Sequence, residues 1–132
     1  LLEGGKERRI PIGDRQVLVS LIDRPKGAEL AKIIPRKRYT KWLDYDKIDR
    51  SAGLRMAKRS DWLYFGGGHK KTAKECFQDE KLSAELRSSR IVLAEQDHIL
   101  CFLPGRTDET VLVTEATDRI LQIRLSDEME GS

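Results

Sequence analysis

Short apolar runs bounded by turn residues recur along most of the chain. Residues 16–22 (Gln-Val-Leu-Val-Ser-Leu-Ile) lie between Gly13-Asp14 and Asp23-Arg24-Pro25, a pattern typical of a strand between two turns. Further runs that predict strands lie at residues 42–48, 54–58, 62–65, 91–94, 99–103, 111–114 and 120–125. Only Glu95-Gln96-Asp97-His98 separates the runs 91–94 and 99–103, so these two are expected to form a hairpin.

Two short helices are predicted between the strands. Thr72 and Glu75 have the spacing of a capping box, in which each side chain satisfies a free N–H group at the start of a helix. The apolar stripe of this helix consists of Ala73, Cys76 and Phe77. A second helix is expected from Ser83, with Leu82 and Leu86 packing one turn apart.

These elements predict an α+β fold, a β-dominated compact domain of about seven or eight short strands with two short helices. Residues 1–38 are expected to be a linker and the end of a preceding segment with one or two strands, frayed up to residue 9 and ordered from Ile10. The main domain is placed at residues 39–125. Residues 126–132 are expected to be an acidic, disordered tail.

Length and charge limit the possible functions. The 132 residues are too few for a complete two-domain enzyme, and the first residue, Leu1, suggests a piece of a longer chain. Residues 1–74 hold 19 Lys/Arg and 9 Asp/Glu, whereas residues 75–132 hold 6 and 13. This asymmetry favours a polyanionic partner for the basic part, or the two halves neutralise each other in the fold. No apolar run is long enough to span a membrane, and two cysteines without a C-x-x-C motif favour the reducing cytoplasm.

The glycine-rich segment Gly66-Gly67-Gly68 is the strongest candidate for binding chemistry. It is followed by His69, Lys70, Lys71 and Lys74, and glycine amides, a helix start and lysines together suit a phosphate oxygen. The spacing G-x-x-x-x-G-K-[ST] is absent, which argues against mononucleotide binding. Contact with a nucleic-acid backbone and a merely solvated loop both remain open.

A second basic stretch precedes the glycines. Its basic residues are Arg55, Lys58 and Arg59, and its aromatic residues are Trp62, Tyr64 and Phe65. The cations would neutralise phosphates, and the rings either stack on bases or belong to the core.

Metal binding and acid–base catalysis are not indicated. His69, Cys76, His98 and Cys101 match no zinc spacing, and both cysteines lie in apolar surroundings that favour burial. Asp108 and Glu109 are expected to be turn or strand-end residues.

The ordered set of motifs over residues 39–124 closely resembles the C-terminal region of bacterial tRNA(Ile)-lysidine synthetase. The matching features are Tyr39–Ile48, the glycine-rich loop with Lys71 and Lys74, Phe77-x-Asp79-Glu80-Lys81-Leu82, Arg87, Arg106, Glu109 and Val113-Thr114-Glu115-x-Thr117. The sequence departs from the family pattern at Arg59-Ser60, Thr72, Ala73, Cys76, Ser83 and Cys101.

The resemblance implies a tRNA-binding, substrate-recognition domain that grips tRNA(Ile) near its acceptor stem, with a fold shared with the phenylalanyl-tRNA synthetase β chain. The family's enzymes use ATP to join lysine to the wobble cytidine. Their catalytic N-terminal domain carries a Ser-Gly-Gly-x-Asp-Ser pyrophosphate loop that this sequence lacks. No cofactor is therefore expected in this domain, and ATP and Mg are implied for a catalytic domain elsewhere.

The resemblance carries binding roles most directly to Lys71, Lys74, Arg87 and Arg106. Arg87 and Arg106 would either contact phosphates or brace the loop through Asp79 or Glu109. Two other classes stay open: a self-association module, giving a homodimer in which the acidic half of one copy meets the basic half of another, and a small independent enzyme that binds ATP or lysine.

Overall fold

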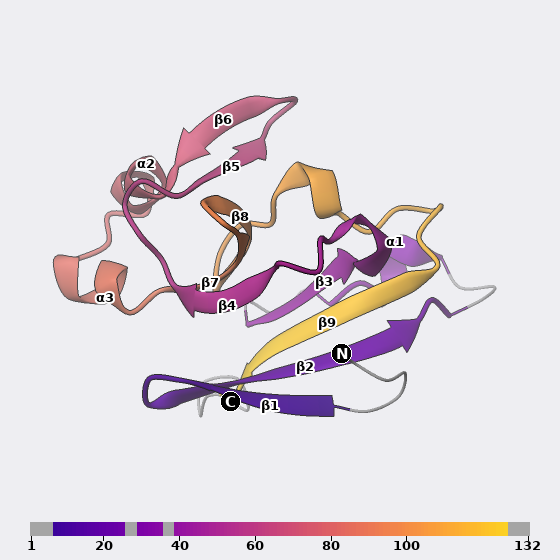
Figure 1. The fold of residues 1–132 in the computed structure, drawn as a ribbon. Helices are drawn as coiled ribbons and strands as arrows, with labels where there is room; N and C mark the ends of the chain where they lie inside the picture. Colours follow the sequence, from indigo (N-terminus) through magenta and orange to yellow (C-terminus); the bar gives the residue numbers. More distant parts are fainter. Residues whose placement is uncertain (1–6, 26–28, 36–38, 127–132) are drawn as a thin grey trace.

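The computed structural model describes residues 7–25, 29–35 and 39–126, and these form nine strands in two sheets (Figure 1). The first sheet has the order β1-β2-β9-β3 and consists of β1 (Glu7–Ile12), β2 (Arg15–Asp23), β9 (Arg119–Ser126) and β3 (Thr40–Asp44). The second has the order β4-β7-β8-β5-β6 and consists of β4 (Gly53–Met56), β7 (Ile91–Glu95), β8 (His98–Leu103), β5 (Trp62–Phe65) and β6 (His69–Thr72). The helices are α1 (Leu30–Ile33), α2 (Ala73–Asp79) and α3 (Ala84–Ser88), with the 3₁₀ turns η1 (Tyr45–Lys47) and η2 (Glu109–Val111). The predicted β-dominated α+β fold is confirmed.

The last strand, β9, joins the two ends of the described chain. It pairs antiparallel with β2 from Gln16↔Ser126 to Asp23↔Arg119, and on its other side with β3. Alternate β9 residues, Leu121, Ile123 and Leu125, face the second sheet. Strands that are distant in sequence therefore form one continuous sheet.

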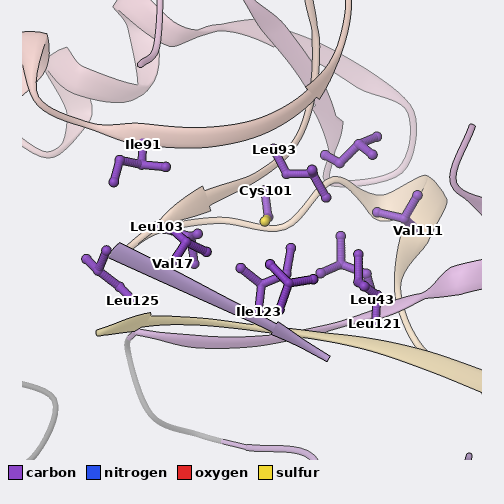
Figure 2. Close-up of a cluster of buried hydrophobic side chains, with 12 residues drawn as sticks. Val17, Leu43, Ile91, Leu93, Cys101, Leu103, Val111, Leu121, Ile123 and Leu125 are labelled. Carbon is purple, nitrogen blue, oxygen red and sulfur yellow. The ribbon is translucent and has the colours of Figure 1, made fainter. Parts of the chain in front are cut away.

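The main core lies between the two sheets. Figure 2 shows the side chains of Val17, Leu43, Leu93, Ile123 and Leu125 converging in this space. All five are at most 6% exposed. The few aromatic residues contribute little to this cluster, so the core is aliphatic.

Strands β7 and β8 are apolar on both faces because both faces are covered. Ile91 and Leu93 face the first sheet, whereas Val92 and Ala94 join a second cluster with Phe77 of α2. A register shift between Leu93 and Ala94 changes the alternation, which explains why successive residues of β8 contribute to one cluster. The uninterrupted apolar runs that predict these strands follow from this two-sided burial.

The local signals for helix α2 and the β7–β8 hairpin are confirmed. The Thr72 hydroxyl accepts a hydrogen bond from the Glu75 amide at 3.2 Å, and Glu75 Oε1 accepts one from the Thr72 amide at 3.0 Å. The hydrogen bonds that the Thr72 amide and hydroxyl donate to the Glu75 carboxylate lower the pKa of Glu75. Ser83 caps α3 as predicted, by accepting a hydrogen bond from the Leu86 amide.

Four sequence expectations are wrong. Residues 7–9, expected to be frayed, form the start of β1, an edge strand held by main-chain pairing with β2 that needs no apolar periodicity. Residues 111–114, predicted to be a strand, include the end of η2 because Asp108 caps that turn. Leu86 does not pack against Leu82 in the core: it is 54% exposed on a helix of only five residues. Finally, residues 45–47 of the strand predicted at 42–48 form η1, which Asp44 caps. In addition, residues 69–72, for which the sequence predicts no strand, form β6 through main-chain pairing with β5.

The division at residue 38 separates strands of the same sheet, since β2 lies beside β9. Its use as a domain boundary stays a prediction. Of the predicted acidic tail, residues 127–132 lie outside the described part, as do residues 1–6 of the predicted linker. No helix in the described ranges has the length and apolar character that crossing a membrane requires.

Candidate nucleic-acid interface

The predicted phosphate loop is the tip of the β5–β6 hairpin. Gly66, Gly67 and Gly68 have φ values of +66°, +85° and +94°, a conformation that favours glycine. The amides of Gly67 and Gly68 donate hydrogen bonds to the two carboxylate oxygens of Glu109, at 3.2 and 2.5 Å. The turn does present its amides to an anion, as the sequence predicts, but the anion is a carboxylate of the same chain.

The lysines of the hairpin differ in their surroundings. Lys70 is exposed, and its Nζ lies 4.1 Å from the centre of the Trp62 ring. Lys71 is only 20% exposed, forms an ion pair with Asp79 and lies over Phe65 at 4.9 Å. Lys70 can therefore leave its ring for a phosphate at small cost, whereas Lys71 would have to give up an ion pair.

The basic stretch before β5 is mostly used inside the domain. Arg55 forms a two-pronged ion pair with Asp61, at 2.7 and 2.8 Å, and also donates to the carbonyl of Gln96. The hydrogen bond to Asp61 raises the pKa of Arg55. Lys58 pairs with Asp97 at 3.2 Å. Arg55 and Lys58 therefore stabilise the loop that leads into β5.

Arg87 and Arg106 have different roles from each other. Arg87 Nε donates to the carbonyl of Leu82 at 2.8 Å and so braces the connection between α2 and α3. The Arg106 guanidinium lies 4.7 Å from the centre of the Phe65 ring and is exposed. Within the described part of the chain, neither arginine forms the expected brace through Asp79 or Glu109: Asp79 binds Lys71, and Glu109 binds the glycine turn.

Three predicted cations, Arg59, Lys70 and Lys74, are exposed and form no ion pair with any described residue; they are here called the exposed cations. Arg106 is also exposed but lies over the Phe65 ring. The Lys74 amide donates to the carbonyl of Arg59 at 3.3 Å, which places these two residues side by side. Lys70 lies on β6, which leads directly into α2. In Figure 1, this hairpin and α2 lie at the end of the molecule remote from β1 and β2. His69, also exposed, begins β6.

Ion pairs also join the two halves of opposite charge. Lys58 pairs with Asp97, Lys71 with Asp79, and Arg24 with Glu115. Part of the charge asymmetry is thus neutralised within the fold. The exposed cations take no part in these ion pairs.

The aromatic residues of β5 form a cluster that the sequence does not reveal. The Trp62 ring stacks on His98, with 4.3 Å between ring centres and 6° between planes, and Tyr64 meets both rings edge-on. His98 Nε2 lies 2.7 Å from Asp108 Oδ2, and Asp108 is fully buried. Trp62 is therefore held by the fold through His98, and the Lys70 ammonium lies over the Trp62 ring.

The buried Asp108 carboxylate connects β5, His98 and the turn η2 through hydrogen bonds. It accepts hydrogen bonds from the Tyr64 amide at 2.6 Å and from the Thr110 amide at 2.8 Å. Burial alone would raise the pKa of Asp108, but hydrogen bonds from Thr110, Tyr64 and His98 together lower it. The sequence places Asp108 at a turn, correctly, but gives no sign of its partners 10 and 44 residues away.

The described residues gather no metal cluster, and both thiols are buried. No group of three or more His, Cys, Asp or Glu side chains lies together there. Burial raises the pKa of Cys76 and of Cys101, that of Cys101 to about 12. The glycine turn connects two antiparallel strands and not a strand and a helix, so it differs from the phosphate loop of mononucleotide-binding folds. A pocket of about 260 Å³ beside Ile10 and Tyr45 includes none of the predicted binding residues.

Comparisons with known proteins agree with this fold. No family model matches the chain. It is 33% identical over 107 residues to tRNA(Ile)-lysidine synthase of Parabacteroides distasonis, an alignment covering 80% of this chain. Its fold matches the crystal structure of a TILS C-terminal domain with a TM-score of 0.70 and 15% identity, over 92% of this chain and 91% of that one.

The chain resembles a tRNA(Ile)-lysidine synthase in sequence and a TILS C-terminal domain in fold. It spans 23% of the length of the Parabacteroides protein. The similarity therefore supports an accessory domain of a tRNA-lysidine synthase, and it confirms the resemblance predicted from residues 39–124.

Proposed function

We propose that this chain is the tRNA-binding, substrate-recognition domain of a tRNA(Ile)-lysidine synthase, the ATP-dependent ligase that joins lysine to the wobble cytidine of tRNA(Ile). The observation that carries the proposal is the set of exposed cations on β6, on α2 and just before β5 in a domain with these similarities. ATP and Mg²⁺ belong in this proposal to a separate catalytic domain. Because both thiols are free and buried, a reducing cytoplasm suits the protein.

The exposed cations would bind phosphates of the acceptor stem. Phosphate contacts fix the register and orientation of a nucleic acid. An A-form stem presents 2′-hydroxyls and a shallow minor groove, so its shape is what a surface of this kind recognises. Arg59, Lys70 and Lys74 supply the charge, and the hairpin held by Asp108 and Glu109 supplies a fixed geometry.

The test is binding of the chain to a fluorescent acceptor-stem minihelix across a salt series, with the variant Lys70→Ala/Lys74→Ala. We expect weaker binding and a slope of log K against log salt that is smaller by about 0.9 per lost phosphate contact, the B-DNA value. The matched control is Lys32→Ala/Arg50→Ala, which removes two exposed cations outside the five-stranded sheet. Lys71→Ala should have less effect than Lys74→Ala because Lys71 is paired with Asp79.

Two results would reject this function. One is no binding at low salt; the other is equal loss in the Lys70→Ala/Lys74→Ala variant and its control. Concentration-dependent mass in the absence of RNA affinity would instead favour the self-association module, with the acidic half of one copy facing the basic half of another.

A further inference from the structure

We propose that the amides of Gly67 and Gly68 form a phosphate site that Glu109 occupies until a phosphodiester displaces it. The two amides point to one carboxylate, at 3.2 and 2.5 Å, from a turn of three successive glycines with positive φ. Successive main-chain N–H groups in such a conformation form a concave anion site. The Glu109 carboxylate shows that this concavity accepts an oxyanion.

The hydrogen bonds of Glu109 are easier to replace than those of the neighbouring Asp108. Asp108 is fully buried and holds β5 through hydrogen bonds from Tyr64, Thr110 and His98. Glu109 is only partly buried, and both of its hydrogen bonds to the turn lie at the surface. Water can replace a surface hydrogen bond at little cost, so Glu109 can leave while Asp108 keeps the hairpin in place.

The turn has space and charge for the incoming group. A Cβ atom built on Gly67 or on Gly68 would meet no other atom within 4 Å, so the surroundings of these residues are open. His69 and Lys70 follow directly on β6, and both are exposed. A phosphodiester replacing the carboxylate would keep one negative charge on the amides and gain these neighbours.

The exchange has a consequence for selectivity. Glu109 belongs to the same chain, so a phosphate must compete with its carboxylate for the two amides. This competition lowers the apparent affinity of the turn for a phosphate that makes no other contact. A phosphodiester already held by Lys70 and Lys74 has a high local concentration at the turn and competes well. Glu109 would thus favour a ligand that engages the whole surface. The inference rests on the proposed function for this ligand, but the anion site itself can be tested without RNA.

The experiment follows the amide NMR signals of Gly67 and Gly68 while inorganic phosphate is added to the wild type, Glu109→Ala and Glu109→Gln. Asp118→Asn is the matched control, because Asp118 is an exposed acid before β9 with no side-chain partner among the described residues. We expect the two glycine signals to respond to phosphate at least fivefold more tightly in both Glu109 variants than in the wild type or the control. Unchanged chemical shifts in β7 and β8 would show that the variants are folded.

Equal responses in all four proteins, or no glycine response in either Glu109 variant, would overturn the proposal. If the turn becomes disordered in Glu109→Ala, Glu109→Gln decides, since glutamine still accepts a hydrogen bond from the turn without the charge. In a second arm the minihelix replaces phosphate, and Glu109→Gln should bind it more tightly than Asp118→Asn does. A phosphate response without minihelix binding would leave the anion site standing and reject the tRNA function.

Discussion

Replacing Asp108 by asparagine should destabilise the domain more than any exposed acid substitution on the hairpin side. The buried carboxylate accepts from two main-chain amides, those of Tyr64 and Thr110, and it contacts His98 Nε2. Asparagine keeps the shape but replaces one oxygen by an NH₂ group. In either orientation of the amide, one main-chain N–H then faces another donor.

The magnitude follows from these contacts. An unsatisfied buried amide costs about 1–3 kcal/mol, and the remaining hydrogen bonds lose the added strength that a charged acceptor gives. We therefore expect the free energy of unfolding to fall by about 3 kcal/mol, which corresponds to a decrease in Tm of about 10 °C for a domain of this size. Urea denaturation monitored by tryptophan fluorescence gives the value directly, because Trp62 stacks on His98.

The pH dependence provides an independent check. Hydrogen bonds lower the pKa of folded Asp108 below its ordinary value of 3.8, so its ionised form stabilises the fold above that pH. This stabilisation is lost as the pH falls through the folded pKa. The difference between wild type and Asp108→Asn should thus stay constant from pH 7 to about pH 5 and shrink as the pH falls below 3.8. A difference below about 0.5 kcal/mol at pH 7, or one that does not change with pH, would refute the reasoning.

Two further perturbations test the interior of the second sheet. Arg55→Met should lower the free energy of unfolding by about 3 kcal/mol in a urea titration, because it leaves the buried Asp61 carboxylate without its ion pair. Lys58→Met, which removes an exposed ion pair, should lower the same free energy by under about 1 kcal/mol. Burial raises the pKa of Cys101 to about 12 in the fold, so above pH 9 the unfolded state loses a proton that the folded state keeps. The free energy of unfolding of the wild type should therefore fall by about 1.4 kcal/mol per pH unit relative to that of Cys101→Ala. Free energies that change in parallel with pH in the two proteins would contradict this.

The elements that the sequence predicts well are those whose signal is local. The Thr72–Glu75 capping box spans four residues, and the β7–β8 hairpin requires only two apolar runs and a short polar connection. The strand β6 escapes such reasoning because its sequence, His-Lys-Lys-Thr, is polar and its pairing with β5 is made by the main chain. The same applies to β1, an edge strand that includes Pro11.

For the candidate site, the sequence indicates which residues belong to the basic surface, but not which partners each of them has in the fold. Charge alone places Lys70 and Lys71 in one group. Among the described residues, however, only Lys71 of the two has an ion-pair partner, Asp79, which lies eight residues later at the end of α2. Glu109 lies 41 residues from Gly68, so no local pattern could show that it fills the glycine turn. Such assignments depend on which faces the fold brings together, and that is decided by long-range packing.

The place of β9 at the centre of its sheet sets the order in which the protein can be made. A ribosome delivers residues 119–126 after the other eight described strands, yet β3 and one edge of β2 pair with this strand. Until it emerges, two apolar strand edges stay without a partner, and closing the sheet must join Gln16 to Ser126. Contacts of such sequence separation make folding slow. The nascent domain is thus exposed to misassociation until β9 is synthesised, and a chain that stops before Arg119 keeps the β1–β2 pair but cannot join β3 to it.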